Sequence, residues 1–163
     1  MIQRIQSLFL LLAALIGITV FFFPIYFLSV KGFSYDIFIT SVKNVHADIP
    51  PSFKIDMIFP LVIIIVLIII SICTIFLYKK RTLQMKLCRF GLITNIVFVV
   101  LIFMFADSIK SKFVAELFLK PEEVIISFKT GSILPLIMVV LFVLAGIFIS
   151  KDEKLIRSAD RLR

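Results

Sequence analysis

Residues 58–78 read IFPLVIIIVLIIISICTIFLY, and this stretch decides the fold class. It carries no charged residue and is mostly Ile, Val and Leu, and a helix that crosses a bilayer needs about 20 such residues. A lone β-strand is excluded because its backbone groups would stay unpaired in lipid. Strands of a membrane barrel alternate polar and apolar residues over about 10 positions, and this stretch does not alternate. The stretch therefore predicts a transmembrane helix.

Three further charge-free stretches lie on either side of it, at residues 8–28, 90–106 and 133–149. The chain is 61% hydrophobic, well above the roughly 45–50% of soluble domains, so a water-soluble monomer is excluded. The sequence predicts an all-α membrane protein in which four transmembrane helices form a bundle, as a single integral membrane domain over residues 1–163. Pro24 is expected to kink or end the first helix at its far end.

The charges are divided unequally between the two sides that four spans create. Both ends of the chain and the loop at 79–89 fall on one side, with eleven basic and three acidic residues. The loops at 31–56 and 107–132 fall on the other side, and each sums to zero. The whole net charge of +8 therefore lies on one side. The positive-inside rule assigns that side, and with it both termini, to the cytoplasm.

The two outward loops carry patterns of short strands. Residues 33–40 alternate apolar and polar side chains, and residues 124–128 are a second candidate strand. Between them, Ile109 and Phe113 belong to an apolar stripe that predicts a third helix continuing outward as far as Pro121. Two alternatives stay open: a small sheet between the loops, or irregular chain lying on the lipid interface.

The four predicted spans contain no Asp, Glu, Lys, Arg or His. Charged groups inside a membrane usually mark ion paths, proton relays or catalytic sites, so their absence argues against a proton-coupled transporter and an intramembrane hydrolase. Cys73 and Cys88 form no C-x-x-C pair, and His46 has no second His or Cys nearby. We therefore expect no catalytic residues, no metal site and no cofactor.

Small polar residues are the remaining polar groups of the second and third spans. Ser71 and Thr74 lie near the cytoplasmic end of one, and Asn95 lies at a similar depth in the next. We expect Asn95 to hydrogen-bond Ser71 or Thr74 between neighbouring helices. Such bonds are worth about 0.6–2 kcal/mol in bilayers, and they serve more often to hold helices together than to bind a substrate.

The cytoplasmic side carries a patterned set of polar and basic residues. These residues fix the orientation, hold anionic lipid head groups, or dock a membrane partner. Nucleic-acid binding is not expected, because aromatic residues are not interleaved among them and no nucleic-acid-binding fold is recognisable. The candidate cluster consists of Arg4, Lys79, Arg81, Gln84, Lys86, Arg89, Arg157, Asp160 and Arg161.

Three motifs carry a resemblance to a known family: MIQRIQ at residues 1–6, FLYKxRxLQxKLCR at 76–89 and KDEKLIRSADRLR at 151–163. Together they resemble, over the full length, a bacterial family of small four-span membrane proteins catalogued only as a domain of unknown function. The resemblance implies a bacterial inner-membrane location and supplies no activity. All three motifs lie on the side that the charge count assigns to the cytoplasm, so we expect their polar residues, Arg89 and Asp160 among them, to meet at the inner end of the bundle.

Three functions follow from these observations. The first is a non-enzymatic accessory or scaffold subunit of a membrane assembly, with membrane lipids and other membrane subunits as its partners. The alternative is a small channel, transporter or lipid-binding protein for an apolar substrate. An enzyme acting at the membrane interface comes third, because no set of residues has catalytic spacing.

Overall fold

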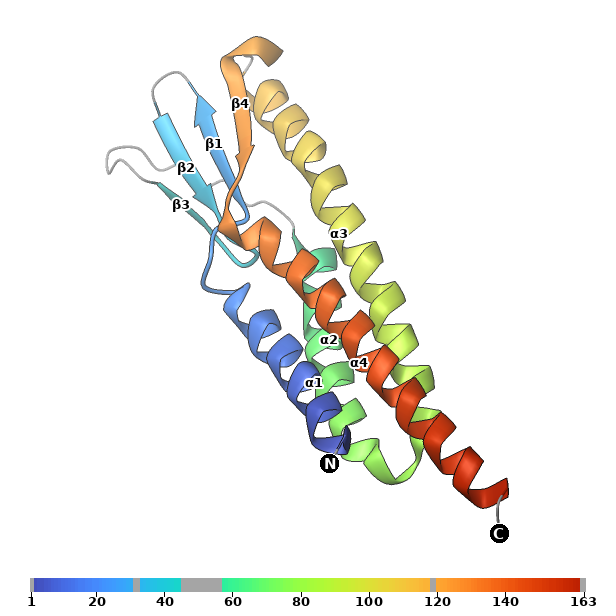
Figure 1. Ribbon diagram of the computed structural model, residues 1–163. Coiled ribbons are helices and arrows are strands. Elements are labelled where there is room, and N and C mark those ends of the chain that lie inside the picture. The colour runs from blue at the N-terminus through green and yellow to red at the C-terminus, as the bar shows by residue number, and fades with distance from the viewer. Residues whose placement is uncertain (1, 31–32, 45–56, 118–119, 162–163) are drawn as a thin grey trace.

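The computed structural model describes residues 2–30, 33–44, 57–117 and 120–161. The helices form a bundle, a small sheet stands at one end of it, and both chain ends lie at the other (Figure 1). We call these the sheet end and the terminal end. In chain order the elements are α1 (Ile2–Thr19), β1 (Tyr26–Val30), β2 (Phe33–Ile37), β3 (Val42–Asn44), α2 (Ile58–Phe76), the 3-10 turn η1 (Leu77–Lys79), α3 (Arg81–Leu117), the 3-10 turn η2 (Pro121–Glu123), β4 (Val124–Phe128) and α4 (Thr130–Arg161).

The four helices pack in a ring, in which α1 and α3 each contact both α2 and α4. Side chains such as Leu10, Ile64, Leu67, Phe98 and Phe142 fill its centre and are almost completely buried. Helices α2, α3 and α4 are each long and apolar enough to cross a membrane, whereas the apolar part of α1 is shorter, Ile5–Thr19. The described residues thus contain three candidate spans and one shorter apolar helix, together with the small sheet that the sequence left as an alternative.

The predicted first span at 8–28 is wrong at its far end. Helix α1 stops at Thr19, and residues 26–28 belong to strand β1. The chain leaves the helix in a turn ahead of Pro24, which disfavours helical geometry at the residue before it. The residues that follow are aromatic and β-branched, a composition suited to a half-buried strand.

Strands are antiparallel throughout, in the order β3-β2-β1-β4. In β1, Tyr26, Leu28 and Val30 are buried, and they alternate with partly exposed neighbours. Tyr26 pairs with Ile37 of β2 on one side and with Phe128 of β4 on the other. One face of the sheet is therefore apolar and needs a cover.

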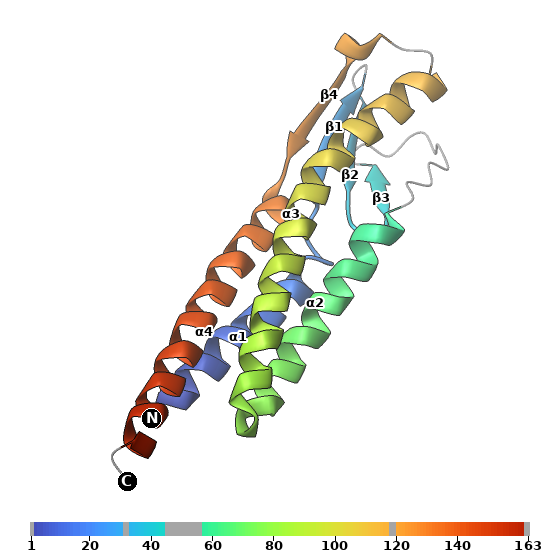
Figure 2. The ribbon, with the colours of Figure 1, turned by 90° about the vertical axis from the view of Figure 1, so that its right-hand side faces the viewer.

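The outer half of α3 supplies that cover (Figure 2). At about 1.5 Å per residue its 37 residues reach about 55 Å, whereas the hydrocarbon core of a bilayer is only about 30 Å thick. Ile109 and Phe113 in this outer half are buried, and the ring of Phe113 lies 6.1 Å from that of Tyr35. The Tyr26 hydroxyl donates to the carbonyl of Ile102. The prediction that the third helix continues outward is confirmed, and the sheet is fixed to it.

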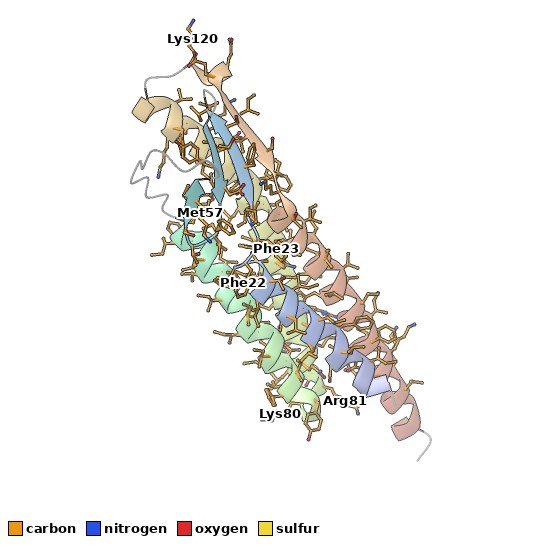
Figure 3. All side chains as sticks on the ribbon, turned by 90° about the vertical axis from the view of Figure 1, so that its left-hand side faces the viewer. Phe22, Phe23, Met57, Lys80, Arg81 and Lys120 are labelled. Carbon is orange, nitrogen blue, oxygen red and sulfur yellow. The ribbon has the colours of Figure 1, made fainter. Side chains whose placement is uncertain are left out.

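Side chains mark the two ends of the molecule (Figure 3). Lys80 and Arg81 lie at the terminal end, Lys120 lies at the far tip of the sheet end, and Phe22 and Phe23 lie between bundle and sheet. Phe22 is 73% exposed at this junction. Exposed apolar side chains cover the helices between these levels, as expected for surfaces that face lipid.

Candidate functional site

Buried polar side chains of the bundle donate to backbone carbonyls, either of a neighbouring helix or of their own helix. Asn95 is fully buried, and its Nδ2 donates to the carbonyl of Pro135 in α4 over 3.2 Å. Ser71 and Thr74 are also fully buried, and each hydroxyl donates to a carbonyl four residues earlier in α2. These groups therefore act within the bundle.

The predicted bond from Asn95 to Ser71 or Thr74 is not the one that forms. The hydroxyls of Ser71 and Thr74 donate to carbonyls of their own helix, as Ser and Thr often do in helices. Asn95 instead donates to a carbonyl of α4. A contact between helices does form at Asn95, with a different partner. Its Oδ1 atom is buried and has no hydrogen-bond partner among the described residues.

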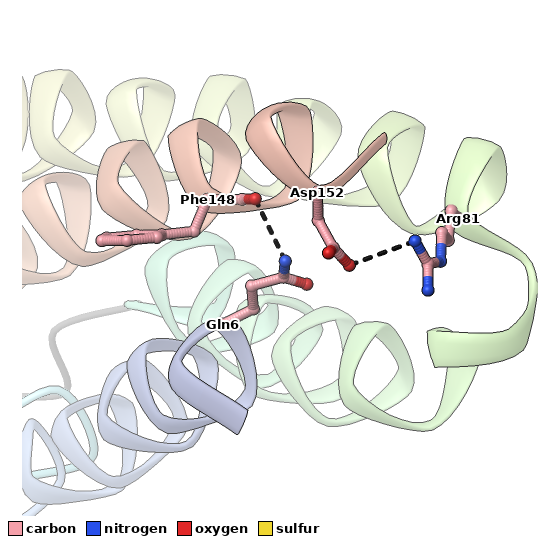
Figure 4. A network of polar contacts seen from close by, with 4 residues as sticks. All are labelled: Gln6, Arg81, Phe148 and Asp152. Atoms are coloured by element: carbon pink, nitrogen blue, oxygen red, sulfur yellow. Dashed lines mark hydrogen bonds and ion pairs between the residues drawn. The ribbon is translucent and has the colours of Figure 1, made fainter. Parts of the chain in front are cut away.

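At the terminal end, α4 is held from two sides (Figure 4). Gln6 of α1 is 2% exposed, and its Nε2 donates to the carbonyl of Phe148 over 3.1 Å. Arg81, at the start of α3, has its Nη1 3.2 Å from the Oδ2 of Asp152. The rings of Phe9 and Phe148 stack at 5.5 Å between centroids beside these contacts. Polar groups of all three sequence motifs thus meet at this end.

Only part of the candidate cluster can be placed. Arg81 is paired with Asp152, Gln84 is 3% exposed, and Lys86 and Arg89 are exposed. The structure does not describe the side chains of the other members of the cluster, which are Arg4, Lys79, Arg157, Asp160 and Arg161. A meeting of Arg89 with Asp160 therefore stays a prediction.

An open groove of about 390 Å³ runs between α3 and α4 near the terminal end. Its floor is apolar: Phe142 and Cys88 are almost fully buried, and the Cys88 thiol lies 3.5 Å from the carbonyl oxygen of Phe142. Arg89 of α3 and two basic residues of α4, Lys151 and Lys154, also line it. We call this the α3–α4 groove.

Sequence reasoning included Arg89 in the cluster and missed Lys151 and Lys154. The signal was present, because Ile147, Lys151 and Lys154 are spaced four and three residues apart and so share one face of a helix. What the sequence did not reveal is that this face lies beside Arg89, since that depends on how α3 and α4 pack.

The described residues offer few possible ligands for a metal ion. They contain no group of three or more His, Cys, Asp or Glu side chains that could hold a metal ion. Cys73 is an exposed free thiol and Cys88 a buried one, while His46 lies outside the described residues.

Comparison with known proteins places the chain in a family. The family model for a domain of unknown function, DUF4293, matches residues 2–162. The chain belongs to the DUF4293 family. No curated protein matches this DUF4293 chain. The match confirms the resemblance to a domain of unknown function, and the three long apolar helices of this DUF4293 chain indicate a membrane protein.

Proposed function

We propose that this protein is a non-enzymatic accessory or scaffold subunit of a larger assembly in a bacterial inner membrane. The observation that carries the proposal is the free edge of strand β4. This strand pairs with β1 on one side, and no other described strand pairs with it. Unpaired edges are ready templates for a strand from another chain.

The two edges of the sheet differ in a way that favours binding at β4. Strand β3, at the other edge, has three residues and carries Lys43, and a short edge with a lysine discourages pairing. Strand β4 has five residues, VIISF, with no charge. Ile125 at this edge is 61% exposed. An edge of this kind is suited to an apolar strand of a partner subunit.

The interior of the bundle supports a scaffold rather than a channel. Phe98, Phe142 and Leu67 fill its centre and are almost completely buried. The buried polar side chains Gln6, Asn95, Ser71 and Thr74 all donate hydrogen bonds to backbone carbonyls of the helices. These contacts stabilise the bundle and offer no surface for a solute.

We propose further that the chain crosses the membrane four times, with α1 as the additional span and both termini in the cytoplasm. The eleven basic residues that the sequence places at the chain ends and in the loop at 79–89 support this orientation. A topology reporter fused after Arg163 should be active only when it is a cytoplasmic reporter. Activity of a periplasmic reporter at that position would contradict the orientation.

The scaffold role is tested by mild-detergent purification from native membranes, followed by identification of the chains that co-purify. Ile125→Lys places a charge on the free edge, and Ser41→Lys is the matched control, an exposed site beside β3. We expect Ile125→Lys to lower the recovery of a specific co-purifying partner at least about tenfold, as loss of a central apolar anchor does. Ser41→Lys should leave that recovery unchanged. Equal recovery with both variants would contradict a partner at β4.

A further inference from the structure

We propose that the α3–α4 groove binds one anionic phospholipid, with an acyl chain on its apolar floor and the phosphate held by Arg89, Lys151 and Lys154. This site is separate from the β4 edge and does not depend on the scaffold role. The argument rests on the shape of the groove, its charges and their level along the helices.

The groove suits an acyl chain because its depth is apolar. Leu92, Phe142 and Ile147 line it along the two helices. Gly146 deepens it, since a Cβ atom built there would have Cys88 Sγ as its nearest neighbour, 3.8 Å away. Its volume of about 390 Å³ lies within the range of roughly 300–1,000 Å³ that ligand pockets span.

The groove suits a phosphate because its cations are available. Lys151 lies with its Nζ 5.7 Å from the centre of the Phe148 ring, and an Arg89 nitrogen lies 3.3 Å from the Met85 sulfur. Among the described residues, neither makes an ion pair with a carboxylate, and no acidic residue lines the groove. Asp152, their neighbour on α4, is paired with Arg81 on the other side.

The level of these cations matches that of lipid phosphates. Arg89 directly precedes the charge-free run at 90–106, and Lys151 follows the charge-free run that ends at Ser150. Both helices therefore change from apolar to basic at one level, where an apolar groove opens between them. Basic pockets between membrane helices on the cytoplasmic side are typical sites for anionic lipid head groups.

The test compares two lipids with the same acyl chains, phosphatidylglycerol and phosphatidylcholine, titrated into the full-length protein in detergent and followed by native mass spectrometry. We expect one phosphatidylglycerol to bind at least about tenfold more tightly than phosphatidylcholine, because the latter carries no net charge. Equal binding of the two lipids overturns the site.

Two variants with equal charge changes separate the groove from general basicity. Lys151→Gln with Lys154→Gln removes two groove cations, and we expect phosphatidylglycerol binding to weaken about 30-fold, as two bases near the head group supply. Lys80→Gln with Lys112→Gln removes two exposed lysines that lie outside the groove and outside the candidate cluster. The control pair should change binding less than about threefold, and equal losses in both pairs overturn the proposal.

A third variant tests the acyl chain. Gly146→Leu fills the groove, whereas Val140→Leu adds bulk at an exposed position of α4 outside it. We expect only Gly146→Leu to weaken phosphatidylglycerol binding, by about tenfold. Binding of glycerol phosphate as tight as that of the lipid would overturn the acyl contact. If a polypeptide co-purifies with the wild type and is lost in Gly146→Leu, the groove binds a protein segment, and the lipid proposal is overturned.

Discussion

The Nζ of Lys129 lies 2.7 Å from the Oδ1 of Asp36, and this ion pair joins segments 93 residues apart in the chain. Asp36 belongs to β2, and Lys129 lies between β4 and α4. The same ammonium lies 4.7 Å from the centre of the Phe27 ring in β1. One lysine therefore ties together the two strands that flank β1 and the strand itself, at the start of α4.

Asp36→Asn and Lys129→Gln should each lower the free energy of unfolding. Both side chains are partly exposed, so solvent screens the pair and the expected loss is about 0.5–1 kcal/mol. Lys129→Gln should cost more, by about 0.5 kcal/mol, because it also removes the contact with Phe27. Thermal unfolding of the four members of a double-mutant cycle measures the coupling. Strictly additive losses would show that the pair contributes nothing.

Tyr26→Phe should lower the free energy of unfolding by about 1 kcal/mol. The change removes the hydroxyl that donates to the Ile102 carbonyl and leaves a buried acceptor without that partner. Tyr35→Phe, on the same sheet face, is the control, and it should change stability less. Unfolding curves in one detergent compare the three proteins. An unchanged midpoint for Tyr26→Phe would mean that β1 is held on α3 by apolar contacts alone.

The same tyrosine should make stability depend on alkaline pH. Burial raises the pKa of the Tyr26 phenol above its ordinary value of about 10. The folded protein then holds this proton more tightly than the unfolded chain, so the stabilisation is complete below about pH 10 and declines as the pH rises further. The decline should be smaller in Tyr26→Phe when unfolding is measured from pH 8 to 11. Identical slopes would contradict a role for the phenol.

The boundary between α1 and β1 shows where sequence reasoning reaches its limit. Residues 8–28 carry no charge, and absence of charge is common to a lipid-facing helix and to a buried strand. The alternation of Tyr26, Leu28 and Val30 is a strand pattern, but it becomes decisive only with β4 beside it, almost a hundred residues later. The strand at 124–128 was predictable because Pro121 separates it from the preceding helix.

The candidate site was predictable in part for a related reason. Charge counting located the basic residues at one end, because orientation depends on composition near the ends of spans. The pairing of Arg81 with Asp152, and of Asn95 with α4, depends on which helix faces which. Which helices face each other is decided by the packing of side chains within the ring, and a single sequence contains no direct signal for it.

Asn95→Leu should lower the stability of the bundle by about 0.6–2 kcal/mol, because it removes the bond to the Pro135 carbonyl. Thr94→Val is the control, since the Thr94 hydroxyl donates to a carbonyl of its own helix and joins no second helix. Unfolding in detergent or in lipid discs measures both. Unchanged or higher stability in Asn95→Leu would show that the bond does not hold α3 to α4; relief of the unpaired Oδ1 would then outweigh it.

Gly131→Ala should destabilise the junction between bundle and sheet. Gly131, in the first turn of α4, donates its amide to the Pro24 carbonyl over 2.9 Å. A Cβ atom there would lie 2.6 Å from that oxygen and 2.8 Å from the carbonyl oxygen of Phe23. Both are backbone atoms of the turn after α1, so the turn and α4 must separate, at an expected cost of about 1–3 kcal/mol.

Gly146→Ala is the matched control for this change, because its added Cβ would meet only Cys88 Sγ, in ordinary contact at 3.8 Å. Alanine is also the better helix former, so Gly146→Ala should leave the free energy of unfolding unchanged or raise it by up to about 1 kcal/mol. The unfolding midpoint should then stay the same or rise. Equal midpoints for the two variants would mean that the turn at Pro24 moves freely relative to α4. In that case the sheet would be held to the bundle by α3 and not by this close approach.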